Sequence, residues 1–379
     1  MAGVLAGNVF APGQYIRDEL DARRWTREDF AAIMGRSLAV MNQIINGKKG
    51  ITPQTAVQLA AAFGTSAELW LNLESVYQLE LWKTDAPDAP DVARRALMYT
   101  TIPVSDVVRR GWIPKCDAAE ALEREVLRFL DIRSFEEAPM LAAAVRKSAG
   151  DEETTAGQIA WRCRVRQLAA SMPVDRFSKS RMKENLGDLH LLTSREREVC
   201  KVSAVLAKMG IRFVVVQHLP ETTIDGCTLW LDDHSPVIAV SLRYDRIDGF
   251  WFTLAHELFH VWHSDRPPVD SDLAGSTRSE KGNYTERRAS EEASNWLIPF
   301  DTLNAFIASA KPYFSKPQIL QFANLHRIHP GIVVGQLQLR GEIDGGQHRE
   351  MLVAMRDIVT ETALCDGWGR LPRTNPPAP

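Results

Sequence analysis

Residues 253–260 read Thr-Leu-Ala-His-Glu-Leu-Phe-His, and they carry the strongest signal for how the second half of the chain folds. The segment contains the pattern His-Glu-x-x-His, formed by His256, Glu257 and His260. Positions i and i+4 lie on one face of a helix, so both imidazoles can reach a single zinc ion. From its position after His256, a glutamate can take a proton from a metal-bound water. We therefore predict a metal-binding helix over about residues 247–262.

The residues around this pattern are strongly apolar. They are Phe252, Leu254, Ala255, Leu258, Phe259 and Trp262. A buried helix with a stripe of unpaired histidine and glutamate would be costly, because these side chains lose their water without gaining a partner. We expect a metal ion to be that partner. The alternative is a pair of hydrogen-bonded core histidines.

A catalytic zinc ion needs a third protein ligand and one open position. We predict Glu286, which begins a second helix over about residues 285–297 and shares one face with Ala289 and Ala293. The small alanines would let the two helices pack closely. Glu291 and Glu292 point to other faces of this helix. Asp265, Asp270 and Asp272, in the loop between the helices, are the weaker competitors. The prediction is one zinc ion per chain, held by His256, His260 and Glu286, with Glu257 as the general base.

Together, residues 253–260 and 286–299 resemble the two motifs of the ImmA/IrrE family of zinc metallopeptidases. The resemblance implies a zincin-like domain and an enzyme that cleaves a partner repressor. Ser290 departs from the family pattern, which usually has Asn or Asp at this position; a residue there could orient a ligand histidine. Tyr284, close to Glu286, could donate a hydrogen bond to a developing oxyanion.

Upstream of the metal-binding helix, the period of the apolar residues changes. Short β-rich runs at 211–216, 227–231 and 237–242 are separated by turn residues and predict a small antiparallel sheet. The run at 237–242 could pair with an extended substrate backbone. Residues 92–209 keep a helical pattern. The expected fold class is α+β and mainly α.

Near the N-terminus, two short helices are predicted on either side of a glycine turn. Thr26 caps the first, Gly35 ends it, and Ser37 caps the second, which runs to Asn46-Gly47. This spacing is typical of a helix-turn-helix. Its predicted core is Ala31, Met34, Met41 and Ile44, and a third helix over 53–63 completes the bundle.

Residues 44–52, Ile-Ile-Asn-Gly-Lys-Lys-Gly-Ile-Thr, resemble a run found in Xre/HigA-type repressors and antitoxins. The resemblance implies that the second helix lies in the major groove of DNA. The residues assigned to the DNA surface are Arg36, Ser37, Leu38, Ala39, Asn42, Gln43, Lys48 and Lys49. Over residues 1–83, eight basic residues are balanced by eight acidic ones. The alternative is therefore a bundle used only for dimerisation.

Composition gives the expected setting of the chain. The formal net charge is −3, and the sequence has no secretory signal pattern and no run of 18 apolar residues. Five scattered cysteines argue against a disulfide framework. We expect a cytoplasmic protein with no membrane segment. The predicted domains are a helix-turn-helix over 1–83, a linker and helical middle region over 84–205, a metallopeptidase over 206–345 and a C-terminal tail over 346–379.

Two hypotheses about function follow from these patterns. The first is a DNA-binding zinc endopeptidase that cleaves a protein such as a repressor in a stress or prophage response. Its partners would be a double-stranded DNA operator, the protein substrate and a second copy in a homodimer. The alternative is a repressor or antitoxin, with a toxin as partner, whose zinc domain binds or senses without cutting. A purely structural zinc site is a third reading, although such a site has no need of Glu257.

Overall fold

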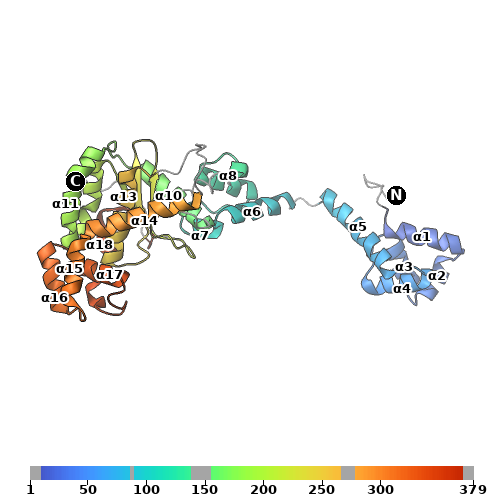
Figure 1. The fold of residues 1–379 in the computed structure, drawn as a ribbon. Coiled ribbons are helices and arrows are strands. Elements are labelled where there is room, and N and C mark those ends of the chain that lie inside the picture. The colour runs from blue at the N-terminus through green and yellow to red at the C-terminus, as the bar shows by residue number, and fades with distance from the viewer. Residues whose placement is uncertain (1–9, 86–88, 138–154, 266–277, 370–379) are drawn as a thin grey trace. The chain divides into compact units, whose positions relative to one another are not determined.

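The computed structural model describes residues 10–85, 89–137, 155–265 and 278–369, which form two compact units (Figure 1). Unit 1 is Met1–Val92 and unit 2 is Ala93–Pro379. The division falls inside a helix, α6 (Ala89–Thr101), whereas the linker composition predicts a boundary at residue 83.

Unit 1 is a bundle of helices with its own apolar core. The helices are α1 (Pro12–Arg23), α2 (Arg27–Ile33), α3 (Leu38–Ile45), α4 (Pro53–Phe63) and α5 (Ala67–Asp85). The predicted caps form: Thr26 and Asp29 make a reciprocal capping box on α2, and the Ser37 side chain accepts from the Val40 amide. The predicted core residues are all buried, which confirms the helix-turn-helix reading of the pattern.

Unit 2 is mainly helical, with one small sheet. Its α-helices are α6, α7 (Val104–Arg109), α8 (Ala119–Leu130), α10 (Ala156–Ala170), α11 (Lys179–Leu191), α12 (Val202–Met209), α13 (Ile247–His263), α14 (Arg278–Leu297), α15 (Phe300–Ala310), α16 (Lys316–His326), α17 (Pro330–Leu339) and α18 (Arg356–Thr362). Short 3-10 helices are η1 (Phe135–Glu137), η2 (Leu192–Ser194), η3 (Glu196–Lys201) and η4 (Arg349–Met351). The strands are β1 (Arg212–Val216), β2 (Gly226–Trp230), β3 (Pro236–Val240) and β4 (Leu364–Asp366).

The sheet is mixed, so the prediction of an antiparallel sheet is wrong for most of its pairs. Its order is β2-β3-β1-β4. Only β2 and β3 run antiparallel, as neighbours joined by a short turn can. β1 pairs in parallel with β3, where Val214 lies opposite Ala239, and also in parallel with β4. β4 forms the edge of the sheet opposite β2, and the sequence pattern assigns this segment to the C-terminal tail.

Each face of the sheet is covered by a separate apolar cluster. Phe213, Val215 and Ile238 face the cluster that contains α13, the helix that carries His256 and His260. Val214, Val216 and Ala239 face the cluster formed with α7, α8 and α10. Consecutive residues of β1 thus face opposite clusters, as expected for a strand that is buried on both faces of the sheet. The middle region, whose role the sequence did not define, therefore supplies the second helical layer.

The two helices that carry the motif residues pack directly on each other. α13 ends one residue beyond its predicted limit, and α14 begins seven residues before the predicted start. Ala289 and Ala293 are fully buried where the helices meet. None of the helices in the described residues is long and apolar enough to cross a bilayer.

Candidate metal centre and nucleic-acid interface

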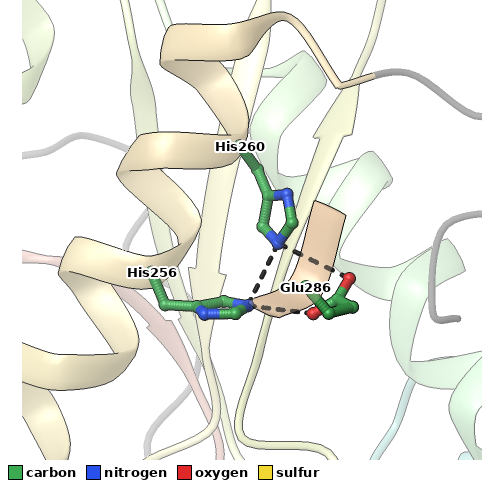
Figure 2. Close-up of side chains that lie close together, drawn as sticks. All are labelled: His256, His260 and Glu286. Carbon is green, nitrogen blue, oxygen red and sulfur yellow. Dashed lines mark hydrogen bonds and ion pairs between the residues drawn. The ribbon is translucent and has the colours of Figure 1, made fainter. Parts of the chain in front are cut away.

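Three side chains predicted as ligands come together between α13 and α14 (Figure 2). His256 and His260 lie one turn apart on α13, and Glu286 reaches them from α14. The two Nε2 atoms are 3.0 Å apart, His256 Nε2 lies 3.1 Å from Glu286 Oε2, and His260 Nε2 lies 3.5 Å from Glu286 Oε1. In the described part of the chain, this is the group of histidine, cysteine and acidic side chains with the geometry to hold a metal ion.

These separations fit a tetrahedral zinc ion. Bonds of 2.0–2.1 Å at tetrahedral angles place neighbouring ligand atoms about 3.3 Å apart. The two Nε2 atoms are 3.0 Å apart, and they lie 3.1 and 3.5 Å from different oxygens of Glu286, so each distance is close to that value although the two carboxylate contacts use different oxygens. The donor set, two imidazoles and one carboxylate, is also the set that zinc takes in hydrolytic sites. The residues present therefore fit the metal.

Contacts to the Nδ1 atoms of the two histidines orient the imidazole rings. His260 Nδ1 lies 3.0 Å from Asp265 Oδ2, and Arg288 donates to both oxygens of Asp265 at 2.8 Å. Ser290 Oγ lies 3.2 Å from His256 Nδ1. Both Nδ1 atoms are engaged, so both Nε2 atoms face the centre of the site. Asp265, considered in the sequence as a ligand, instead supports His260 from behind.

The centre attracts positive charge. Burial raises the pKa of Glu286, but hydrogen bonds from His256 and His260 outweigh it and lower that pKa to about 2. Burial lowers the pKa of His260, but hydrogen bonds to Asp265 and Glu286 and the charge of Glu257 outweigh it, and the pKa rises to about 10. In the metal-free protein a proton on His260 is thus held among carboxylates. A divalent cation would take the place of that charge.

Glu257 is held between α13 and strand β2. Its side chain is buried, and the Thr228 hydroxyl lies 2.8 Å from Glu257 Oε2 and 2.9 Å from the Glu257 carbonyl oxygen. A Cβ at Gly226 would lie 2.6 Å from Thr253 Cγ2 and 3.1 Å from Glu257 Oε1. Only glycine therefore lets β2 approach α13 this closely.

Three of the remaining candidates, Tyr284, Glu291 and Glu292, contact residues outside the cluster. Tyr284 is 56% exposed, and the Arg288 guanidinium stacks over its ring, so the structure does not bring it to the ligands. Glu291 faces Arg287 across one helical turn. Glu292 accepts a hydrogen bond of 2.6 Å from His263. Asp270 and Asp272 lie outside the described residues.

Sequence reasoning missed Thr228, Gly226 and Arg288. Thr228 and Gly226 lie on a strand about thirty residues before Glu257, and only the tertiary packing of β2 on α13 brings them near. Arg288 could have been found from the sequence, because it lies two residues after the predicted ligand Glu286 on the same predicted helix. Its partner Asp265 was considered only as a ligand.

On unit 1, the second helix of the motif, α3, presents part of the expected DNA surface. Ala39, Gln43, Lys48 and Lys49 are exposed, as is Ser37 at the N-cap, and Arg36 is half-buried. Leu38 packs against the core of the bundle, which corrects its assignment as an outward position. Asn42 Oδ1 accepts a hydrogen bond of 3.0 Å from Arg27, a residue that the sequence analysis did not assign. Of the two amide side chains on this helix, the exposed Gln43 is therefore the better candidate for contact with a base edge.

The comparison with protein families agrees with the helix-turn-helix assignment of unit 1. A family model described as helix-turn-helix matches residues 16–70. Through this domain, the chain belongs to the helix-turn-helix family. The matched range covers most of α1 and all of α2, α3 and α4, so the two motif helices and the bundle around them are one known unit.

Relatives of similar sequence include three bacterial proteins. The uncharacterized HTH-type transcriptional regulator YddM of Escherichia coli (strain K12) is 29% identical over 89 residues, which are 24% of this chain and 90% of the relative. Virulence-associated protein I of Dichelobacter nodosus is 32% identical over 75 residues, 20% of this chain and 69% of that protein. Virulence-associated protein A' of the same organism is 36% identical over 69 residues, 18% and 60% of the respective chains.

Among solved structures, an addiction module antidote protein of a HigA family from Coxiella burnetii is 29% identical. It covers 21% of this chain and 86% of its own, with a TM-score of 0.20. All of these similarities cover a quarter of the present chain or less.

Proposed function

We propose that this protein is a DNA-binding zinc metallo-endopeptidase. The observation that carries the proposal is the convergence of His256, His260 and Glu286, with Glu257 on the same helix as the two histidines. In the described residues the cluster offers three side chains that could serve as ligands. A zinc ion with three such ligands keeps one position open, as hydrolytic sites do, whereas structural sites are closed by four.

The three clustered side chains would hold the zinc ion, which when bound would polarise a peptide carbonyl and lower the pKa of a water molecule. Asp265 and Ser290 would keep the histidine rings oriented. Glu257 would accept the proton of the attacking water and return it to the leaving amine. Thr228 supports this role, because its hydroxyl fixes one carboxylate oxygen of Glu257 at 2.8 Å.

The free edge of β2 is the better place for an extended substrate. Residues 237–242 were expected to pair with the substrate, but Val237–Val240 in β3 are already hydrogen-bonded by β1 on one side and β2 on the other. β2 is one of the two edge strands of the described sheet, and it contacts α13 through Thr228. A peptide added to β2 as a further strand would run beside Glu257.

Unit 1 would bring the enzyme to an operator. In helix-turn-helix proteins the second helix lies in the major groove, and dimers read half-sites about one helical turn apart. We therefore include double-stranded DNA and a second copy of this chain among the partners. A repressor bound at the same operator would be the protein substrate, as the resemblance to ImmA/IrrE peptidases implies.

A second candidate function is a repressor or antitoxin, with a toxin as partner, whose metal domain does not cut. The helix-turn-helix match favours it, because such a domain binds DNA and the match covers no part of unit 2. Co-expression with the products of neighbouring genes separates the two. Glu257-dependent cleavage of one of these products supports the peptidase. Equal repression by the wild-type protein and a Glu257 variant, without any cleavage, supports the repressor or antitoxin.

Replacement of Gln43 should change the sequence preference of DNA binding. In Gln43→Ala, discrimination between operator and random DNA should fall by about 1–3 kcal/mol, because an amide reads the edge of adenine. In Lys48→Ala and Lys49→Ala, affinity for both DNAs should fall alike, and the salt slope by about one. Fluorescence anisotropy at several salt concentrations measures both effects. Lys183→Ala, an exposed lysine on α11, is the matched control and should bind as wild type.

Removal of Asp265 should weaken metal binding without removing a ligand. Partners behind a ligand histidine typically contribute 10–100-fold to metal affinity, so we expect a loss of about that size in Asp265→Ala. Competition with a zinc-sensitive chelator measures it. Asp188→Ala, an exposed aspartate on α11, should keep wild-type affinity. Unchanged affinity in Asp265→Ala would mean that the contact with His260 does not orient the ligand.

A further inference from the structure

The parallel strands of unit 2 end at one edge of the sheet. β1, β3 and β4 run in the same direction, and the segments that follow them carry His218, Arg243 and Trp368. In α/β folds, ligands bind in the crevice outside the carboxyl ends of parallel strands. The residues at this edge are therefore candidates for a ligand site. None of them belongs to the metal centre.

Arginines from separate elements converge at this edge. Arg110, at the end of α7, donates to the carbonyl oxygens of His218 at 2.8 Å and Gln217 at 3.4 Å. Arg243 makes a bidentate contact with Asp225 at 2.7 and 3.1 Å. Arg356 of α18 lies 3.5 Å from Asp245 and stacks over the Trp368 ring. We call His218, Arg110, Arg243 and Arg356 the arginine–histidine cluster.

The acidic side chains at this edge leave a positive charge. Asp225 offsets Arg243, Asp245 offsets Arg356, and Asp366 is taken by Arg164, which contacts it at 2.6 Å. Arg110 is hydrogen-bonded to main-chain carbonyls, which carry no net charge. Asp366 and Asp106 also attract the Arg110 guanidinium, but Asp366 is paired with Arg164 and Asp106 with Arg109.

Two buried polar atoms of the cluster have no hydrogen-bond partner in the described residues. They are His218 Nδ1 and Arg356 Nε. Buried polar groups are almost always satisfied, and exceptions often mark a missing ion or water. Burial lowers the pKa of His218, as do the charges of Arg243, Arg110 and Arg356, against an opposing effect of Asp225. The ring is therefore neutral and can donate one hydrogen bond without adding charge.

The backbone around the cluster is held in place before any ligand arrives. The Gln217 amide donates to the Asp366 carbonyl at 2.9 Å, and the Trp368 amide donates to Gln217 Oε1 at 2.9 Å. Gly367 lies between them with a φ of 135°, and a Cβ there would lie 2.4 Å from Gln217 Cβ and 3.3 Å from Arg110 Nη1. A binding edge that is already ordered loses little entropy when a ligand binds.

We propose that the arginine–histidine cluster binds an oxyanion, supplied either by a phosphate group or by a carboxylate. Guanidinium groups suit both, since their planar donors match two oxygens at once. The cluster is partly exposed, with 26% of the Arg243 side chain and 35% of the Arg356 side chain accessible. The proposal does not depend on the metal centre or on peptidase activity.

Titration of the full-length protein with inorganic phosphate and, separately, with N-acetylglutamate amide tests the proposal. Ionic strength is matched with chloride, because screening alone would mimic a weak anion effect. The readouts are isothermal calorimetry and the NMR signal of the His218 ring, assigned with His218→Gln. We expect saturable binding of at least one probe, with a shift of that signal. The probe that saturates identifies the source of the oxyanion.

Variants then assign the binding to these residues. Arg356→Gln and Arg110→Lys should each weaken the saturating probe at least tenfold, and Arg128→Gln, with a side chain 74% exposed on α8, should not. Thermal midpoints check that each variant is folded. If neither probe saturates the wild-type protein, or if a probe binds the Arg356 and Arg110 variants as tightly as wild type, the cluster is not an oxyanion site. The His218 signal gives an answer even if one variant does not fold.

Discussion

Glu257→Gln should retain zinc and the fold but lose cleavage of the protein substrate by at least about a hundredfold, because an amide cannot accept the proton of the attacking water. The substitution keeps the size of the side chain, and the Thr228 hydroxyl can still donate to the amide oxygen. Metal content by mass spectrometry, thermal unfolding and cleavage of the co-expressed substrate give the three measurements.

A matched control for this variant is Glu292→Gln on α14. It is the same chemical change at a glutamate that contacts His263 rather than the three clustered ligands, and we expect full cleavage. Undiminished cleavage by Glu257→Gln would show that another group takes the proton. A loss of zinc in that variant would instead place Glu257 among the ligands.

Glu286→Ala should weaken zinc binding by more than about a hundredfold, since even outer partners of zinc ligands contribute 10–100-fold. It should also abolish cleavage. The reason is geometric: Glu286 is the residue of α14 that reaches both imidazoles, at 3.1 Å and 3.5 Å. Removing it leaves two histidines on one helix. Chelator competition and metal content of the purified protein measure the effect.

Glu291→Ala is the control on the same helix, since its side chain is 65% exposed and faces Arg287. We expect zinc affinity within about twofold of wild type, as for most surface substitutions. If Glu286→Ala binds zinc as tightly as this control, a residue outside the three clustered side chains must complete the site. The double variant His256→Ala/His260→Ala tests the two histidines separately from Glu286. If the helix motif holds the ion, this variant should contain no metal.

The features that the sequence predicted well are those set by short-range chemistry. Thr26 and Ser37 cap their helices as expected, and α4 has the predicted bounds of 53–63, because capping and glycine stops act within a few residues. His256 and His260 lie on one face for the same reason. Glu286 joins them because small alanines allow α14 to pack closely on α13.

The features that the sequence did not predict depend on contacts between distant segments. β1 was predicted to belong to an antiparallel sheet, yet it pairs in parallel with β4, some 150 residues later. A strand of three residues carries almost no periodic signal of its own. Leu38 was assigned to the DNA surface, although its partly buried side chain packs against the bundle core. Thr228 could not be connected with Glu257 before the strand order was known.

Strand β4 also determines the order in which the two units can fold during synthesis. Unit 1 has its own core and every residue it needs by position 92, so it can fold while the rest is still being translated. Unit 2 cannot complete its sheet until residues 364–366 have been made. At typical bacterial elongation rates of about 5–20 residues per second, that interval is roughly 15 to 55 seconds. A nascent chain would therefore present a folded helix-turn-helix well before unit 2 could complete its sheet. Premature termination before residue 364 would leave unit 1 without a complete unit 2.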